Sequence, residues 1–179
     1  MTRWLFLSFM VLLLDQATKQ FAEAMLSAYQ AVNVMPYFNL TLMYNEGAAF
    51  SFLSDQGGWQ RWFFVALASI VTTVLIVWLR RLDPRDREKW VALSLSLIIG
   101  GAVGNLIDRI LYGKVIDFID VYYRAESCLP GFSQWANECH WPAFNLADSA
   151  IFVGVTIMLI DAFFLSSKKG TETDKKKPA

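Results

Sequence analysis

Three long apolar runs constrain this chain more than any other feature of its sequence. Residues 62–79 (WFFVALASIVTTVLIVWL) and residues 90–107 (WVALSLSLIIGGAVGNLI) contain no charged residue, and residues 149–165 (SAIFVGVTIMLIDAFFL) contain only Asp161. A helix that crosses the hydrocarbon core of a bilayer needs about 20 apolar residues, with about 17 as the lower limit. The composition agrees, because 55% of the residues are hydrophobic and only 18% are charged. The sequence therefore predicts a membrane protein with three good spanning helices.

The N-terminal segment has two interpretations. The apolar run WLFLSFMVLLL, followed by the small-residue sequence AEA, suits a cleaved signal peptide. However, Asp15, Lys19 and Glu23 follow one another at a spacing of four residues, which gives one polar stripe on a helix. A retained helix over residues 3–25, with this stripe turned into a bundle, explains the pattern better. Asp15 and Lys19 then form a buried pair.

Basic residues gather beside the apolar runs. Eleven of the 16 Lys and Arg residues are Arg3 or lie in the linker 80–89 (RRLDPRDREK) and the tail 168–177. Segments rich in Lys and Arg stay on the cytoplasmic side of a membrane. The linker and both termini are therefore expected in the cytoplasm, and residues 27–60 and 112–146 on the outer side. The formal net charge of zero gives no support for nucleic-acid binding.

These signals predict a mainly α-helical membrane protein with one domain, residues 1–166, followed by a disordered basic tail, residues 167–179. The four expected helices cover about residues 3–25, 61–80, 89–111 and 147–166. In the first outer segment, apolar and polar residues alternate around residues 37–44, which is typical of short strands. We therefore expect a small β-cradle outside the membrane, and a loop or short helix in the second outer segment.

Two acidic residues lie where the outer ends of the last two helices are expected to meet. Asp117 belongs to GKVIDFIDVYY, and Asp148 belongs to FNLADSAIF, where Asn145 is a natural N-cap and Asp148 the N3 residue. Helix capping alone could explain Asp148, because the helix dipole favours an acid in the first turn. Antiparallel neighbours joined by an outer loop bring their outer ends together, so Asp117 and Asp148 could face each other.

A close pair of carboxylates can catalyse hydrolysis. Two such acids share one proton because ionising both is costly. The ionised acid can take a proton from water while the protonated acid polarises a carbonyl, which is the chemistry of aspartic peptidases. Acids inside a membrane also mark proton or ion pathways, so a small transporter is the alternative function. Asp120, three residues after Asp117, is expected to be an exposed loop or helix-end charge.

The third apolar run carries small and polar residues at helical spacing. Gly100 and Gly104 form a pair that is typical of close helix packing. Asn105, Asp108 and Arg109 follow at i, i+3 and i+4 near the outer end of this helix. A charge inside a membrane needs a partner. A buried Asp108–Arg109 pair could therefore serve the fold, a functional site, or both.

Both cysteines, Cys128 and Cys139, fall in the second outer segment. If that segment faces an oxidising compartment, a disulfide between them is plausible. Cys139, His140 and Glu138 are adjacent, but their number and spacing are poor for zinc, so we expect no metal. A Ser–His–Asp triad is not expected either, since His140 is the only histidine.

Five ordered stretches resemble the lipoprotein signal peptidases (signal peptidase II), which are aspartic peptidases of the bacterial inner membrane. The stretches are DQATK at 15–19, NEGAAFS at 45–51, GGAVGNLIDR at 100–109, VIDFI at 115–119 and FNLADSAI at 144–151. The resemblance covers about residues 3–166. It implies four transmembrane helices with both termini cytoplasmic, a retained first helix, a β-cradle formed by the first outer segment, and an active site near the periplasmic face.

The resemblance also implies the reaction. The implied substrate is a prolipoprotein that carries diacylglycerol on a cysteine, and the implied step is hydrolysis of the peptide bond just before that cysteine. No metal or other cofactor is implied. The implied partners are these substrates, membrane lipids and inhibitory cyclic-peptide antibiotics, and we expect the enzyme to be a monomer.

Residue by residue, the family motifs imply that Asp117 and Asp148 are the catalytic acids. Residues that the motifs assign to substrate binding or to support of the site are Asp15, Asn45, Gly47, Asn105, Asp108, Arg109, Asn145 and Ala147. One departure is the segment RAESCLPGFSQWANECHWPA, which makes the second outer loop longer than the family pattern. It touches none of the five motifs, but it could alter access to the site. Asp120 lies outside the catalytic assignment, so Asp120→Asn should keep most activity.

Overall fold

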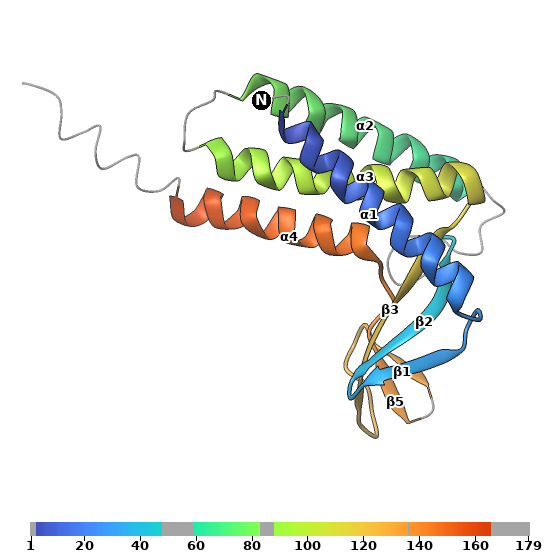
Figure 1. Cartoon of the computed structure of the whole chain (residues 1–179). Helices are drawn as coiled ribbons and strands as arrows, with labels where there is room; N and C mark the ends of the chain where they lie inside the picture. The colour runs from blue at the N-terminus through green and yellow to red at the C-terminus, as the bar shows by residue number, and fades with distance from the viewer. Residues whose placement is uncertain (1–2, 48–58, 83–87, 136, 166–179) are drawn as a thin grey trace, which may run out of the picture.

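The computed structural model of the chain describes residues 3–47, 59–82, 88–135 and 137–165. Four long helices form a bundle, and a five-stranded sheet extends from one end of it (Figure 1). The helices are α1 (Arg3–Met25), α2 (Trp59–Arg81), α3 (Lys89–Tyr112) and α4 (Leu146–Ile160), which continues as the π-helical segment η3 (Asp161–Leu165). The expected disordered tail, residues 167–179, lies outside the described residues.

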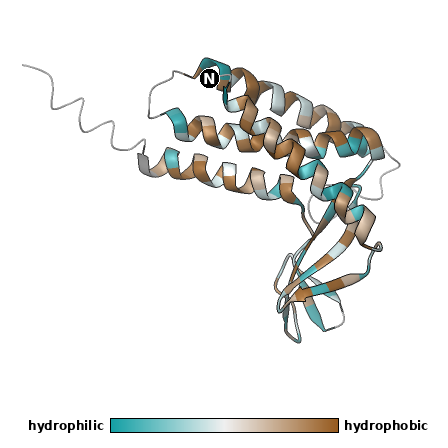
Figure 2. Ribbon diagram, viewed as in Figure 1, coloured by the Kyte–Doolittle hydropathy of each residue, from teal (hydrophilic) through white to brown (hydrophobic). Residues whose placement is uncertain are grey.

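Helix α3 is the centre of the bundle and contacts α1, α2 and α4. Leu79 of α2 packs with Ala92, Leu95 and Ile99 of α3 in a buried cluster. Helices α2 and α4, by contrast, bury few of their side chains, and Phe152 of α4 is 73% exposed. Figure 2 shows hydrophobic residues along all four helices and mixed residues on the sheet. Apolar surface of this extent is suited to contact with lipid rather than water.

Three helices of the described part are long and apolar enough to cross a membrane, namely Trp59–Arg81, Lys89–Tyr112 and Leu146–Phe163. They coincide with the three apolar runs of the sequence. The predicted helical membrane protein with a small antiparallel sheet is confirmed at this level. The buried residues of α1 include Asp15 and Lys19, and those of α3 include Asp108.

Glycines allow α3 to lie close to α1. A Cβ added at Gly100 would lie 2.7 Å from the carbonyl oxygen of Ser8, and a Cβ added at Gly104 would collide with the carboxylate of Asp15. Side chains do not tolerate such distances, so glycine is needed where these two helix backbones meet. The prediction of close packing at Gly100 and Gly104 is confirmed, and at Gly104 the closeness also creates room for a buried acid.

Helix α3 ends at a glycine, and a strand follows directly. Gly113 has φ of 77°, and its N–H donates to the carbonyl oxygen of Arg109. This left-handed cap is one that glycine adopts without steric cost. Strand β3 (Val115–Arg124) then begins, rich in the β-branched and aromatic residues that favour strands. The stretch around Asp117, which the sequence placed after the outer end of the preceding helix without assigning it to a helix or a strand, is therefore a strand.

The sheet has the strand order β1-β2-β3-β5-β4, and all neighbours are antiparallel. Its other strands are β1 (Ala31–Met35), β2 (Phe38–Asn45), β4 (Ser133–Trp135) and β5 (Glu138–His140). The alternating pattern around residues 37–44 predicted β2 correctly. The expectation for the second outer segment was wrong in part, because its described residues 113–135 and 137–145 contain strands and no helix. Both outer segments thus build the sheet.

The chain after β5 runs along β3 and then enters α4. Trp141 N–H donates to the carbonyl oxygen of Val121 at 2.8 Å, and Phe144 exchanges backbone hydrogen bonds with Ile119 at 2.8 and 3.1 Å. Helix α4 begins two residues later. Because of this pairing, the first turn of α4 lies beside the beginning of β3, where Asp117 is located.

Candidate active site

Asp117 and Asp148 come from different elements and are linked by one side chain. Asp117 is the third residue of β3 and is 2% exposed, while Asp148 lies in the first turn of α4 and is partly exposed. Nδ2 of Asn145 lies 2.7 Å from Oδ1 of Asp117, and Oδ1 of Asn145 accepts a hydrogen bond from the backbone N–H of Asp148 at 2.9 Å. The two acids that the sequence analysis paired therefore meet around Asn145.

The hydrogen bonds that these two carboxylates accept, within the described residues, all come from neutral amides. Asn45 donates to Oδ2 of Asp117 at 3.3 Å, and Asn105 donates to Oδ1 of Asp148 at 2.7 Å. Asn145 donates its side-chain amide to Asp117 and its backbone N–H to Asp148. Neutral donors orient a carboxylate without matching its charge, so neither acid has an ion-pair partner in direct contact among the described residues.

The start of α4 is a capping box. The side chain of Asn145 accepts from the backbone N–H of Asp148, and the side chain of Asp148 accepts in turn from the backbone N–H of Asn145 at 3.3 Å. This reciprocal pair satisfies two backbone donors that a helix N-terminus otherwise leaves unpaired. It fixes the rotamer of Asp148 while leaving Oδ1 for Asn105.

The environment of Asp117 favours its protonated form near neutral pH. Burial is the main cause and the negative charge of Asp148 the second, and together they raise the pKa of Asp117 to about 7. The amides of Asn45 and Asn145 and the charge of Lys19 act in the opposite direction but are weaker. A buried acid that keeps its proton beside a second carboxylate is the arrangement that shared-proton chemistry requires.

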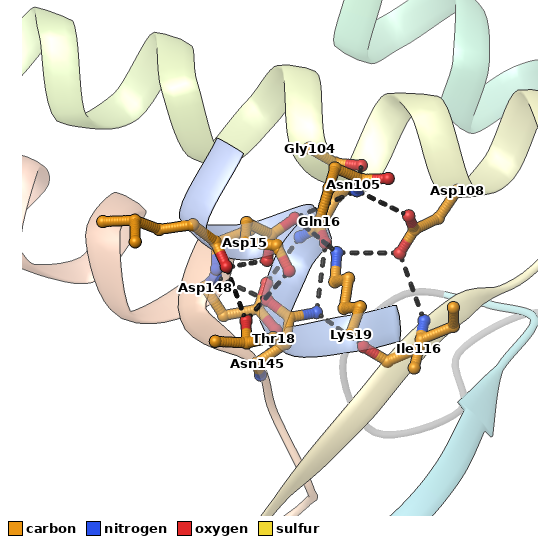
Figure 3. A network of polar contacts seen from close by, with 12 residues as sticks. Asp15, Gln16, Thr18, Lys19, Gly104, Asn105, Asp108, Ile116, Asn145 and Asp148 are labelled. Carbon is orange, nitrogen blue, oxygen red and sulfur yellow. Dashed lines mark hydrogen bonds and ion pairs between the residues drawn. The ribbon is translucent and has the colours of Figure 1, made fainter. Parts of the chain in front are cut away.

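A second group of acids surrounds Lys19 of α1. Nζ of Lys19 lies 2.8 Å from Oδ2 of Asp15, 2.7 Å from Oδ2 of Asp108 and 2.9 Å from Oδ1 of Asn105 (Figure 3). The side chains of Lys19, Asp15 and Asp108 are fully buried. An ammonium group has three N–H donors, and here each has an acceptor. The other oxygen of Asp15 accepts from the backbone N–H of Ala147 at 2.9 Å.

Lys19 also determines how Asn105 points. An ammonium group can only donate, so the oxygen of the Asn105 amide must face Lys19, and its nitrogen must face Asp148. The sequence predicts Lys19 as half of a buried pair with Asp15, and Lys19 is not among the predicted site residues. Its position in DQATK, four residues after Asp15 on the polar stripe of α1, is the signal that could have identified it.

Asp108 and Arg109 do not pair with each other. Asp108 binds Lys19, while Arg109 donates to the carbonyl oxygens of Asn105 at 3.3 Å and Gly47 at 3.2 Å. Adjacent residues on a helix point in different directions, which explains why the suggested pair does not form. Arg109 instead holds the segment after β2 against α3. Its positive charge lies within the electrostatic influence of both Asp148 and Asp117.

A cavity of about 710 Å³ opens beside Asp148. Its polar lining consists of Asn45, Asn105, Arg109, Asp148 and Ser149. The remaining lining is apolar and comprises Val115, Trp141, Pro142, Ala143, Phe144, Ile151, Phe152, Val153 and Val155. Several of the apolar residues of α4 in this wall are exposed on the outer surface of the bundle. The cavity therefore joins an acidic polar end to an apolar wall that continues along α4.

Asp120 is not the exposed charge that the sequence analysis expected. Its side chain is 1% exposed, with Oδ2 2.8 Å from Oγ1 of Thr41 and Oδ1 2.7 Å from Nδ1 of His140. Successive strand residues alternate between the two faces of a sheet, so Asp117 and Asp120, three residues apart, face opposite sides. Asp120 thus lies outside the cluster around Asp148.

The second outer segment contains a disulfide between Cys128 and Cys139. Cys139 is fully buried in β5.

Among the described residues, no group of three or more His, Cys, Asp and Glu side chains is arranged to hold a metal ion. The residues brought together around the two acids are thus carboxylates, amides and two cations.

Apolar helices of spanning length and two acids joined through one amide are what a membrane peptidase of the aspartic type requires, and the comparisons with known proteins identify the family. The family model described as Signal peptidase (SPase) II matches residues 7–164. The lipoprotein signal peptidase of Pseudomonas putida is 49% identical over 170 residues, covering 94% of this chain and 90% of that protein. The lipoprotein signal peptidase of Aeromonas hydrophila is 46% identical over 168 residues, covering 93% and 92%.

Solved structures agree with the sequence comparisons. A bacterial membrane enzyme determined by the in meso method at 2.3 Å resolution has a TM-score of 0.73 and 26% identity, covering 100% of this chain and 95% of that chain. A second such enzyme, determined at 1.9 Å, has a TM-score of 0.70 and 27% identity, covering 92% and 94%. The chain belongs to the signal peptidase II family, and it is an aspartic-type peptidase that cleaves signal peptides from lipoproteins. The comparisons give no support for a transporter.

Proposed function

We propose that Asp117 and Asp148 are the catalytic pair, and that they hydrolyse the peptide bond just before the diacylglyceryl-modified cysteine of a prolipoprotein. The observation that carries the proposal is the pairing of the two acids through Asn145, with Asp148 at the polar end of a cavity. The apolar wall of that cavity offers a surface for the acyl chains of the substrate.

The two acids have different roles in proton transfer because their surroundings differ. Asp117, which is buried and has a raised pKa, holds the shared proton. Asp148, which lines the cavity, takes a proton from the attacking water while Asp117 gives its proton to the carbonyl oxygen. As the tetrahedral intermediate collapses, the C–N bond breaks, Asp148 returns its proton to the leaving nitrogen, and Asp117 recovers a proton from the intermediate. The pair ends in its starting state.

Neighbouring residues orient the two acids and the chain around them. Asn45, Asn105 and Asn145 fix the carboxylates through neutral hydrogen bonds. Arg109 holds the backbone at Gly47, close to Asn45. Lys19 acts one step away by orienting Asn105.

We further propose that α1 is a fourth transmembrane helix, with both termini in the cytoplasm and the site near the periplasmic face of the inner membrane. The outward side chains of α1 are apolar, with Phe6 65% and Leu14 58% exposed, while Asp15 and Lys19 turn inward. The basic residues of the linker 80–89 support the orientation. In this arrangement the enzyme acts as a monomer in contact with membrane lipids, and inhibitory cyclic peptides occupy the cavity beside Asp148.

The test is cleavage of a purified diacylglyceryl-modified prolipoprotein by the wild type, Asp117→Asn and Asp148→Asn. Each variant should lose at least about 10³-fold in kcat, because the pair acts as a unit. Asp161→Asn is the matched control, since it makes the same change in the segment that continues α4 at the end away from the site. Cleavage at the normal rate by either site variant, with a normal rate in the control, would reject the pair.

A further inference from the structure

On the face of β3 opposite Asp117, a buried cluster joins three strands of the sheet. Asp120 of β3 lies 2.7 Å from Nδ1 of His140 in β5 and 2.8 Å from Oγ1 of Thr41 in β2. Nδ2 of Asn39 lies 3.5 Å from Oδ2 of Asp120. Asp120 is 1% exposed and His140 7% exposed. A buried carboxylate needs hydrogen-bond donors, and here the donors come from both neighbouring strands.

The ring of His140 is held on several sides. The ring of Tyr122 stacks on it with centroids 5.3 Å apart, and the ring of Trp135 lies 5.6 Å away. Nε2 of His140 is 3.8 Å from Oε2 of Glu138. The preceding residue, Cys139, is buried and carries the disulfide. These contacts keep Nδ1 pointed at Asp120.

The two partners lie on the chain segments that carry the catalytic acids. Asp120 is three residues after Asp117, and His140 is eight residues before Asp148. Tyr122 pairs with His140 across the sheet, and the pairing of the two segments continues from there toward α4. The separation of the two carboxylates depends on how these segments align, and the Asp120–His140 contact is a side-chain link between them.

Side chains of strand β2 form hydrogen bonds with side chains on both faces of β3. Its register against β3 shifts between Leu40 and Met43. Such a bulge turns the following residues to the other face of the sheet. Because of the shift, Thr41 contacts Asp120 on one face and Asn45 contacts Asp117 on the other.

We propose that Asp120 and His140 are positioning residues that hold Asp117 and Asp148 at the separation needed for catalysis. The inference rests on the proposed catalytic pair. Directional hydrogen bonds fix the alignment of two segments more sharply than apolar contact does, and small displacements in an active site are expensive. Neither residue belongs to the family motifs quoted for the site, and His140 lies in the long second outer loop.

The first test measures kcat, KM and thermal unfolding for Asp120→Ala, His140→Ala and the double variant. Each single change should lower kcat about 10- to 100-fold, with KM within about twofold. The double variant should be little worse than either single one, because both remove the same link. Arg124→Gln is the matched control, since it breaks the exposed Arg124–Glu138 ion pair between the same two strands. This control should keep kcat within about twofold.

Conservative variants separate positioning from general stability. Asp120→Asn can still accept from His140 and donate to Thr41, and His140→Asn offers an amide nitrogen near the position of Nδ1. Both should recover most of the kcat lost in the alanine variants. If the alanine variants fail to fold, kcat is measured in Asp120→Asn, His140→Asn and Thr41→Val instead. Thr41→Val removes the other hydrogen bond to Asp120. These three variants then test the positioning role.

The pH profile supplies an independent measurement. The charges that act on Asp117 come from Asp148 of α4, Lys19 of α1 and Arg109 of α3. If Asp148 moves away in His140→Ala, its negative charge raises the pKa of Asp117 less. The fall of kcat at alkaline pH should then begin at a lower pH than in the wild type. A purely structural role lowers the unfolding temperature and leaves that fall at the same pH.

The inference is overturned if the alanine variants match Arg124→Gln in kcat, or if their losses appear in KM alone. It is also overturned if the fall of kcat at alkaline pH stays unchanged. Activity in Asp117→Asn or Asp148→Asn would instead reject the proposed function itself. The two failures are therefore distinguishable with the same substrate and the same assay.

Discussion

Two groups of acids lie at the end of the bundle from which the sheet extends, and they are neutralised in different ways. Asp15 and Asp108 share the ammonium group of Lys19 at 2.8 and 2.7 Å. Asp117 and Asp148 accept hydrogen bonds from neutral amides. The first group is an ion-paired network, whereas the second can balance its charge by sharing a proton.

Asn105 is the boundary between the two groups. Its oxygen accepts from Lys19 and its nitrogen donates to Asp148. The lysine one helical turn from Asp15 is therefore an ion-pair partner for Asp15 and Asp108, while Asp148 receives the neutral amide of Asn105. Aspartate is therefore ion-paired in one group and bound by neutral amides in the other, because different donors surround it.

The largest effect is expected from removing the cation of the structural group. Lys19→Met leaves Asp15 and Asp108 buried without their partner, which should destabilise the fold by about 3–5 kcal/mol. The measurement is the yield and thermal unfolding of the purified protein in detergent. Lys114→Met is the matched control, because Lys114 lies over the ring of Tyr44 rather than beside buried acids. Equal stability of the two variants would contradict the structural role of Lys19.

The next effect concerns the reactive group and the pH dependence of stability. The pKa of Asp117 is raised in the folded protein, so between about pH 4 and 7 the folded state binds more protons than the unfolded state. This residue therefore makes the protein less stable as pH rises through that range. Asp117→Asn should be more stable relative to wild type at pH 8 than at pH 5, by at most about 2–3 kcal/mol.

Thermal unfolding of wild type and Asp117→Asn at both pH values measures this difference. A difference between the two proteins that does not change with pH would show that the surroundings of Asp117 resemble those of an ordinary ion-paired acid. The proposed contrast between the two groups would then be lost.

A smaller effect is expected at the helix contact that makes room for Asp15. Gly104→Ala places a Cβ against the carboxylate of Asp15, which must then move away from Lys19 and from the N–H of Ala147. Overpacking of this kind should cost about 1–3 kcal/mol, visible as a lower unfolding temperature. Ala102→Gly on the same helix is the control for a change in helix propensity alone. An unchanged unfolding temperature in Gly104→Ala would mean that α1 and α3 can separate freely here.

The smallest effect is in the rate at alkaline pH. Above about pH 7, Asp117 loses its proton, and a site with both acids ionised can no longer protonate the carbonyl. The value of kcat should then fall about tenfold per pH unit, which corresponds to about 1.4 kcal/mol. Steady-state cleavage between pH 5 and 9 measures it. A constant rate up to pH 9 would assign the proton-donating role to another group.

Much of the fold could be predicted because it depends on local patterns. The three apolar runs, the alternation in β2, the cap at Asn145 and the small residues at Gly100 and Gly104 each have a signal within a few residues. The strand around Asp117 was not predicted, because a short apolar stretch after a spanning helix suits a strand or a helix equally well. Gly113 followed by β-branched and aromatic residues was the signal for the change.

The environment of each acid could not be predicted in the same way. Asp120 was interpreted as an exposed charge, although it is buried against Thr41 and His140, because a single acid in an outer segment has no local signal of burial. For Lys19 the sequence predicted only the pair with Asp15. Its acceptors Asn105 and Asp108 come from another helix, and hydrogen bonds between elements leave no periodicity in the sequence.

The sequence by itself determined where the helices run, which residues cap them, and that Asp117 and Asp148 belong to family motifs. Only the tertiary structure decided that Asn145 joins these two acids, that Lys19 also binds Asp108, and that β3 turns Asp117 and Asp120 to opposite faces. The physical reason is that apolar burial and capping follow from neighbouring residues, whereas the protonation of a buried acid depends on donors and charges that folding brings from distant parts of the chain.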